Sequence, residues 1–191
     1  MRADAQANRD RLLVVAGVVF AEQGIDASMR DIARRAGVGL ATLLRHFPTR
    51  EALLEVLLRT SFDELTTRAA ELETVGPPRD ALMVWLREFV AFTTANHGVV
   101  TSMVKAIEEP ESALHASCVS MRAAGARLLS GAQAVGAARP DIDGDDLFAL
   151  VSALAWLGDQ PRLEVRARRL FEVVMGAMLT GHDLGARTGS A

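Results

Sequence analysis

Apolar residues recur every three or four positions along almost the whole chain, and this period restricts the fold more than any other feature. Leu12, Ala16, Val19 and Phe20 show it in the first predicted helix, which Gly24 should end in the left-handed conformation. The alternation typical of strands is almost absent. We therefore predict an all-α fold of about nine helices. The expected ranges are 8–23, 29–36, 40–46, 50–73, 79–96, 98–108, 111–135, 144–158 and 161–181.

A helix, a glycine-containing turn and a second helix follow one another between Ser28 and Phe47. Ser28 followed by Asp31 is typical of a capping box, which predicts a helix start at about Met29. Thr49 should cap the next long helix. The expected core of this segment is Ile32, Ala33, Ala36, Val38, Leu43 and Phe47. The arrangement is typical of a helix-turn-helix, although two packed amphipathic helices with no role in DNA binding would show the same pattern.

Charge is distributed unevenly along the chain. The net charge is −3, but residues 1–60 carry +2, from nine arginines and seven acidic residues. Residues 61–191 carry −5, from twelve basic and seventeen acidic residues. Between residues 28 and 50, five arginines and one aspartate give a local charge of +4. Such a segment is expected on a surface that meets DNA phosphates, and an ordinary solvated surface is the alternative.

The second helix of this segment should leave several side chains on its open face. Gly39 would let the start of the helix approach a DNA backbone closely. Thr42 carries a hydroxyl and a methyl group, which suit a base edge or a phosphate. The candidate DNA-binding residues on or near this face are Gly39, Leu40, Thr42, Leu44, Arg45 and His46.

Residues 9–58 resemble the DNA-binding domain of the TetR family of bacterial transcriptional regulators. The matching motifs are FAEQG in the first helix, SMRDIARRAGV in the second, and TLLRHFPTREAL across the third and the start of the fourth. The resemblance implies a homodimer with a three-helix DNA-binding domain at residues 1–50, in which residues 28–47 form the helix-turn-helix. It implies a helical ligand-binding and dimerisation domain at residues 51–191, connected through the helix at 50–73.

The resemblance also assigns roles to single residues. It places Ser28, Arg30 and Arg50 on DNA phosphates. The chain departs from the family pattern at Leu44, where tyrosine is usual, and at Gly39, where serine is frequent. The missing tyrosine hydroxyl removes one phosphate hydrogen bond, worth roughly 1 kcal/mol, although Leu44 can contact a thymine methyl group instead.

The function implied by the resemblance is a DNA-binding transcriptional regulator, a repressor that a small-molecule ligand releases from a palindromic DNA operator. We expect a small apolar or amphipathic effector, no cofactor, and a location in the bacterial cytoplasm. Because Leu44 and Gly39 weaken the DNA-binding pattern, the alternative function is a helical adaptor that has lost strong DNA binding.

Aromatic, sulfur-containing and polar side chains of the second domain are candidates for the effector pocket. They are Trp85, Phe89, Phe92, Met103, His115, Cys118, Met121, Arg122 and Trp156. Ordinary core packing is the alternative for each of them. The spacing of His115, Cys118 and Arg122 places them on one helix face. An oxidant-sensing Cys118 is a further alternative.

The last two helices should form the dimer interface, as the resemblance implies. Their apolar stripes are Leu147, Leu150, Val151 and Leu154 on one helix and Leu170, Val173, Val174 and Met178 on the other. In a twofold dimer these stripes would pair as a four-helix bundle, which suits operator half-sites about 34 Å apart. The alternative is that the stripes belong to the core of a single chain.

Other classes of protein are disfavoured by what the sequence lacks. No run of about 18 apolar residues is free of charge, and the first residues are too polar for a signal peptide. The single cysteine excludes an intramolecular disulfide and a multi-cysteine metal site. No Glu-x-x-His pair, phosphate-binding glycine loop or nucleophile elbow is present. We therefore predict no enzyme, no catalytic residue and no metal site.

Overall fold

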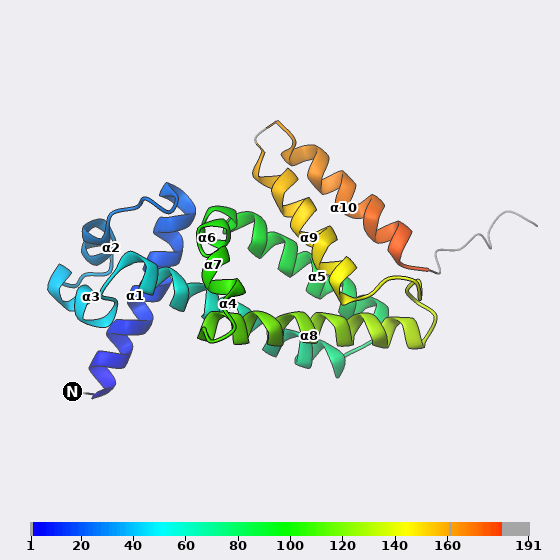
Figure 1. Ribbon diagram of the computed structural model, residues 1–191, viewed down its shortest axis with the longest axis horizontal. Coiled ribbons are helices and arrows are strands. Elements are labelled where there is room, and N and C mark those ends of the chain that lie inside the picture. Colours follow the sequence, from blue (N-terminus) through cyan, green and yellow to red (C-terminus); the bar gives the residue numbers. More distant parts are fainter. Residues whose placement is uncertain (1, 161, 181–191) are drawn as a thin grey trace, which may run out of the picture. The chain divides into compact units, whose positions relative to one another are not determined.

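The computed structural model describes the backbone of residues 2–160 and 162–180, with side chains for all of these except residues 2–5 and 164. Within these ranges it contains ten α-helices and one isolated β-bridge (Figure 1). The helices are α1 (Arg2–Gln23), α2 (Met29–Arg35), α3 (Leu40–His46), α4 (Arg50–Glu73), α5 (Pro78–Ala95), α6 (His97–Ser102), α7 (Val104–Glu108), α8 (Ala113–Ala134), α9 (Gly144–Asp159) and α10 (Glu164–Met178). The predicted all-α fold is confirmed.

Two helices differ from the sequence-based expectation. Helix α1 begins at Arg2, earlier than the apolar spacing indicated. The helix expected at 98–108 is divided at Met103, whose backbone (φ −104°, ψ 7°) leaves helical geometry. The residues before this break include one glycine, two valines and a threonine, all of which are weaker helix formers than alanine or leucine.

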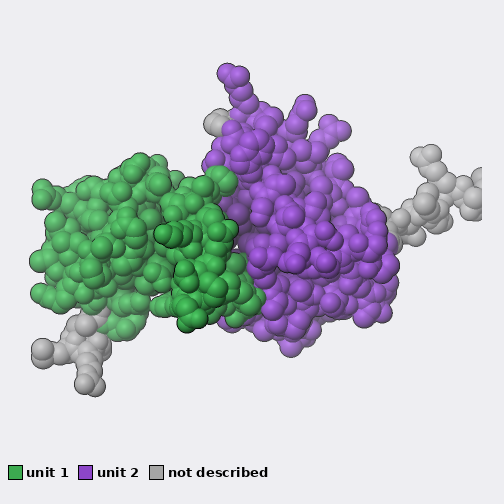
Figure 2. Space-filling view, viewed as in Figure 1, with its two compact units in different colours: residues 1–64, 95–121 green, residues 65–94, 122–191 purple. Residues whose placement is uncertain are grey.

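The chain forms two compact units (Figure 2). Unit 1 comprises residues 1–64 and 95–121, and unit 2 comprises residues 65–94 and 122–191. The chain crosses from one unit to the other inside α4, before the last residue of α5 and inside α8. The functional division expected after residue 50 stays a prediction.

Unit 1 has a core in which α1, α2, α3 and α4 all take part. Leu12, Ala16 and Val19 of α1 are fully buried, as their spacing predicted. Gly24 ends α1 with φ +78°, and its N–H donates to the carbonyl of Phe20 at 2.9 Å. The left-handed end of α1 is therefore confirmed. The remaining core side chains of these helices include Ile32, Ala33, Leu43, Leu53, Leu54 and Leu58.

Unit 2 is organised around Trp85 on α5, which is fully buried. Its indole N–H donates to the carbonyl of Leu65 at 2.9 Å, so the ring's one polar group is satisfied inside the core. The ring lies 5.1 Å from that of Phe89, measured between centroids. Gly125 of α8 lies against the indole so closely that a Cβ there would be 2.5 Å from Cη2.

Helices α9 and α10 pack against each other as an antiparallel hairpin within unit 2 (Figure 1). Helix α9 begins with a capping box, in which Asp143 accepts from the N–H of Asp146 at 3.0 Å and Asp146 accepts from the N–H of Asp143 at 3.1 Å. The far end of α10 is tied to the loop before α9, because the N–H of Thr180 donates to the carbonyl of Ala137 at 3.0 Å. None of the helices in the described ranges has the length and apolar character needed to cross a membrane.

Candidate nucleic-acid interface

Ser28 begins α2 by capping it. Its extended backbone (φ −74°, ψ 127°) lets its Oγ accept from the N–H of Arg30 at 3.3 Å. The predicted helix start is therefore confirmed, but the predicted capping box is wrong. The carboxylate of Asp31 bonds to the side chains of Gln23, Arg34 and Arg35 instead of returning to the backbone at Ser28.

The turn between α2 and α3 depends on Gly37. The N–H of Gly37 donates to the carbonyl of Arg34 at 3.1 Å, and the N–H of Val38 donates to the carbonyl of Ala33 at 3.0 Å. This pair of bonds is the Schellman motif, which requires a left-handed residue, and Gly37 supplies it with φ +68°. The sharp change of direction therefore follows from glycine at this position.

The inward faces of α2 and α3 are apolar and closed. Ile32 and Leu43 are fully buried, Ala33 and Ala36 are nearly so, and Phe47 is 1% exposed, as predicted. The guanidinium carbon of Arg9 lies 5.6 Å from the centroid of the Phe47 ring, a cation–π contact that the sequence analysis did not identify. These contacts fix α3 on the first helices of unit 1.

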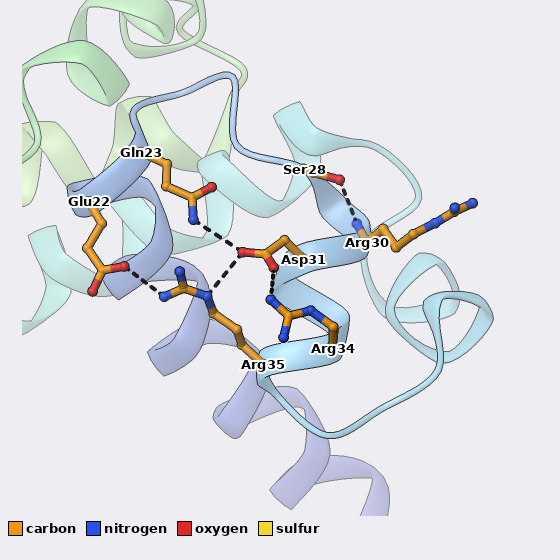
Figure 3. A network of polar contacts seen from close by, with 7 residues as sticks. All are labelled: Glu22, Gln23, Ser28, Arg30, Asp31, Arg34 and Arg35. Atoms are coloured by element: carbon orange, nitrogen blue, oxygen red, sulfur yellow. Dashed lines mark hydrogen bonds and ion pairs between the residues drawn. The ribbon is translucent and has the colours of Figure 1, made fainter.

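A network of charged side chains joins α1 to α2 (Figure 3). Asp31 accepts from Gln23 at 3.2 Å and forms ion pairs with Arg34 and with Arg35, the latter at 3.0 Å. Arg35 also pairs with Glu22 at 2.7 Å. The hydrogen bond from Arg34 lowers the pKa of Asp31 below its ordinary value, and the one from Gln23 adds to this. Two of the five arginines in the basic segment are therefore neutralised within the protein.

Two other arginines of the segment extend into solvent. Arg30 and Arg45 are exposed, and neither forms an ion pair with any side chain that the structure describes. Figure 3 shows Arg30 directed away from the network around Asp31. The fifth, Arg50, lies at the start of α4, with Nη1 3.5 Å from Asp26 and a buried Nε that has no partner among the described residues.

The other predicted DNA-binding residues lie on α3 and at the first residues before α2 and α3. Ser28 and Gly39 are exposed, and Leu44 is 40% exposed. Leu40, Thr42 and His46 are half-buried. Gly39 is the N-cap of α3 and supplies no side-chain cap, in line with its departure from serine. Thr49 caps α4 as predicted, since its Oγ1 accepts from the N–H of Ala52 at 3.0 Å.

The predicted pocket residues are divided between the two units. Trp85, Phe89 and Phe92 belong to unit 2, and the first two are buried. The members in unit 1 are Met103, Cys118 and Met121, which are buried, and His115, which is half-buried with Nδ1 2.8 Å from the carbonyl oxygen of Ile107.

Two pocket candidates require correction. Trp156 is 53% exposed on the outer side of α9. Arg122 is also exposed, and its guanidinium pairs with Asp145 and lies 4.6 Å from the centroid of the Phe148 ring. Both side chains therefore lie on the surface of unit 2, because their positions on α9 and α8 face away from its core.

The predicted dimer-interface residues also divide into two groups. Leu147, Val151, Leu154 and Met178 are at most 4% exposed, so they belong to the core of a single chain. The reason is that α9 and α10 direct these stripes inward, into unit 2. Leu150, Leu170 and Val174 are half-buried, and Val173 is 57% exposed. Only this second group has surface to offer a partner.

Among the described residues, no three histidine, cysteine or acidic side chains are grouped in a way that could hold a metal ion.

Two family profiles match the chain. Residues 12–57 match "Bacterial regulatory proteins, tetR family", and residues 77–178 match "Transcriptional regulator SbtR-like, C-terminal domain". The first match spans α2, the turn and α3, which carry the surface described above. The second spans more than half of the chain.

Solved structures and curated proteins agree with these profiles. The TetR transcriptional regulator SCO0520 from Streptomyces coelicolor is 34% identical, with 91% of this chain and 99% of that chain covered at a TM-score of 0.74. A TetR transcription regulatory protein from Mycobacterium vanbaalenii is 32% identical, with coverages of 94% and 99% and a TM-score of 0.72. The HTH-type transcriptional repressor KstR2 of Rhodococcus jostii is 24% identical over 189 residues, with 92% of this chain and 93% of the relative covered.

Proposed function

This chain belongs to the TetR family and is a DNA-binding transcriptional regulator, and on that premise we propose that it is a homodimeric repressor released from a palindromic operator by a small molecule. The family is one of transcriptional regulators, not of enzymes. The printed name of the KstR2 relative describes a repressor, which supports repression here.

The observation that carries the DNA-binding proposal is the outer surface of α2 and α3. Arg30 and Arg45 reach solvent without a carboxylate partner among the described residues, while Arg34 and Arg35 are held by Asp31. We propose that Arg30 contacts phosphate and that Arg45 reads a base edge, with Leu44 against a thymine methyl group. Ser28, Gly39, Leu40, Thr42, His46 and Arg50 complete the proposed interface.

Residues 1–50 are the DNA-binding domain in this proposal, and residues 51–191 bind the effector and the second protomer. The effector is a small apolar or amphipathic molecule, because the proposed pocket residues that remain after correction are mainly aromatic and sulfur-containing. We place the protein in the bacterial cytoplasm, where its operator is.

Repression and release follow from a two-state equilibrium. In one state of the dimer the two α3 helices fit successive major grooves about 34 Å apart. An effector that binds the other state more tightly shifts the dimer towards that state and so lowers its affinity for the operator. The size of this effect is set by the ratio of the effector's affinities for the two states. The coupling free energy between two such sites is usually about 1–3 kcal/mol.

The test is selection of bound duplexes from a random DNA pool by the purified protein at two salt concentrations. We expect a palindromic motif whose affinity falls steeply as salt rises, because phosphate contacts release counterions. Arg30→Ala removes one phosphate contact from each half-site, so the salt dependence of the dimer should weaken by about two contacts. Arg45→Ala should relax the base preference at one position in each half-site. The control is Arg127→Ala, which removes an arginine of α8 that pairs with Glu73 of α4, and it should change neither the salt dependence nor the base preference.

Two results would overturn parts of this assignment. Recovery of no motif at low salt would favour an adaptor without DNA binding. An Arg45→Ala protein with unchanged affinity and base preference would show that α3 is not the reading helix.

A further inference from the structure

One exposed carboxylate lies beside the residues proposed to bind DNA phosphates. Asp26 lies in the turn between α1 and α2, where the N–H of Ala27 donates to the carbonyl of Gly24 at 3.2 Å. It precedes Ser28, a proposed phosphate contact, by two residues. Its carboxylate is 3.5 Å from Nη1 of Arg50, a second proposed phosphate contact, and its side chain is 93% exposed. A negative charge in this place opposes the approach of DNA.

The pair between Asp26 and Arg50 differs from the other ion pairs of the basic segment. Arg35 lies 2.7 Å from Glu22 and 3.0 Å from Asp31, so two carboxylates hold it and join α1 to α2. Among the described residues, Arg50 has one carboxylate partner, at a distance longer than that of a charge-assisted hydrogen bond. Asp26 has no other hydrogen bond or ion pair with the described residues. The pair is therefore loose and solvated, and another anion can replace its carboxylate.

The guanidinium of Arg50 is partly enclosed and partly open. Its Nε is buried and has no hydrogen-bond partner among the described residues. Its Nη1 lies beside the almost fully exposed carboxylate of Asp26, and the Arg50 side chain as a whole is 36% exposed. A phosphate that approached Nη1 from solvent would meet the position that the carboxylate occupies. Phosphate and Asp26 therefore compete for the same end of one guanidinium.

We propose that Asp26 competes with DNA phosphate for Arg50 and so lowers the affinity of the protein for every duplex. The proposal rests on the DNA-binding surface of the proposed function and adds a residue that opposes binding. In the free protein Asp26 holds the Arg50 guanidinium. In the complex a phosphate takes that place, and the carboxylate is left unpaired beside a second negative charge.

This competition acts on the strength of binding and not on the choice of sequence. Phosphate contacts carry no direct sequence information, so operator and random DNA are weakened alike. The base contacts proposed for α3 are unaffected, because Asp26 lies before α2 and pairs with the first residue of α4. A weaker complex with unchanged base preference is easier for an effector to dissociate.

The test is Asp26→Asn, measured by fluorescence anisotropy with the selected operator duplex and a random duplex of the same length. Asparagine suits a turn as well as aspartate does, so the loop should keep its conformation. Loss of the carboxylate should tighten binding about threefold in each half-site, the size of a typical exposed ion pair. The dimer should therefore bind both duplexes about tenfold more tightly, and the gain should shrink as salt screens the charges.

Two further variants show that the gain belongs to the charge at this position. Asp26→Glu keeps the carboxylate on a longer side chain and should lose most of the gain. The matched control is Glu71→Gln, which also removes one exposed carboxylate that pairs with an arginine, Arg68, but lies in unit 2. It should leave both affinities unchanged. The melting temperature of each variant should stay close to that of the native chain, because these carboxylates are exposed.

A double-mutant cycle shows whether Asp26 acts through Arg50. Arg50→Met keeps an unbranched side chain, removes the guanidinium and should itself weaken DNA binding. In that background Asp26→Asn should tighten binding by the dimer about threefold or less, since only the direct repulsion between carboxylate and DNA is then removed. An equal gain in both backgrounds would mean that Asp26 acts on the DNA directly, and it would overturn the competition for Arg50.

The outcomes separate this proposal from the function on which it rests. A native chain that binds neither duplex overturns the DNA-binding function and the competition with it. If the native chain binds DNA and Asp26→Asn binds no more tightly, the function stands and the competition is overturned. A gain confined to the operator also overturns the competition, because Asp26 would then affect base preference.

Discussion

Replacing Gly125 with alanine should lower the free energy of unfolding, although alanine is the better helix former. The added Cβ would lie 2.5 Å from Cη2 and 2.7 Å from Cζ3 of Trp85, about 1 Å inside ordinary carbon contact. Since Trp85 is fully buried and hydrogen-bonded to Leu65, its ring has no direction in which to retreat. Overpacking of this kind costs up to about 3 kcal/mol, and the helix propensity of alanine returns about 1 kcal/mol.

The expected net loss is therefore about 2 kcal/mol, or about 4–8 °C in Tm for a chain of this size. Urea unfolding followed by circular dichroism measures it. Gly131→Ala in the same helix is the control, because its Cβ would meet only the Cβ of Pro78, at 4.0 Å. That variant should be as stable as the native chain or up to about 1 kcal/mol more stable.

A double-mutant cycle with Trp85→Phe isolates the contact. The smaller ring lacks the atoms that Gly125→Ala would strike, so alanine should be neutral or stabilising in that background. If Gly125→Ala instead stabilises the native chain as Gly131→Ala does, the indole has free volume beside it. The side of the indole that faces α8 would then not be closely packed, and the reasoning from close packing would be refuted.

Three further predictions concern single side chains. Leu44→Tyr restores a hydroxyl to α3 and should tighten operator binding by the dimer about thirtyfold in a fluorescence-anisotropy titration, from one hydrogen bond of roughly 1 kcal/mol in each of the two half-sites. Because the folded pKa of Asp31 is below its ordinary 3.8, its stabilising effect is complete above that pH and is lost as pH falls through the lowered pKa. Asp31→Asn should therefore flatten the acid side of the stability profile, and an unchanged profile would contradict the network of Figure 3. Asp143→Ala removes the capping box of α9 and should cost about 1 kcal/mol in thermal unfolding; no loss would mean that the box adds nothing.

Local features of the interface were predictable because they depend on neighbours in sequence. The ends of α1 and α2 follow from single glycines, and the burial of Leu43 and Phe47 follows from their spacing. The partners of Asp31 were not predictable in the same way. Gln23 lies 8 residues before Asp31 and on another helix. Its amide can reach the Asp31 carboxylate only when α1 and α2 have packed together, and it then competes with the backbone N–H of Ser28 for that carboxylate.

The spacing of apolar residues shows which face of a helix is buried, but not what buries it. Leu147, Val151 and Leu154 have the period of an interface helix, and their partner turned out to be the chain's own core. Trp156 has the composition of a pocket residue and lies on the surface. The first error arises because burial against the same chain and burial against a second copy leave the same periodic pattern. The second arises because residue type alone does not show which way a side chain faces.

The contrast between Trp85 and Trp156 also gives the protein two separate optical reporters. The chain has two tryptophans and no tyrosine, so its near-ultraviolet emission comes almost entirely from these two indoles. One is fully enclosed and the other is 53% exposed, so they should emit at shorter and longer wavelengths respectively. In Trp156→Phe, the remaining emission would follow the unfolding of unit 2 alone.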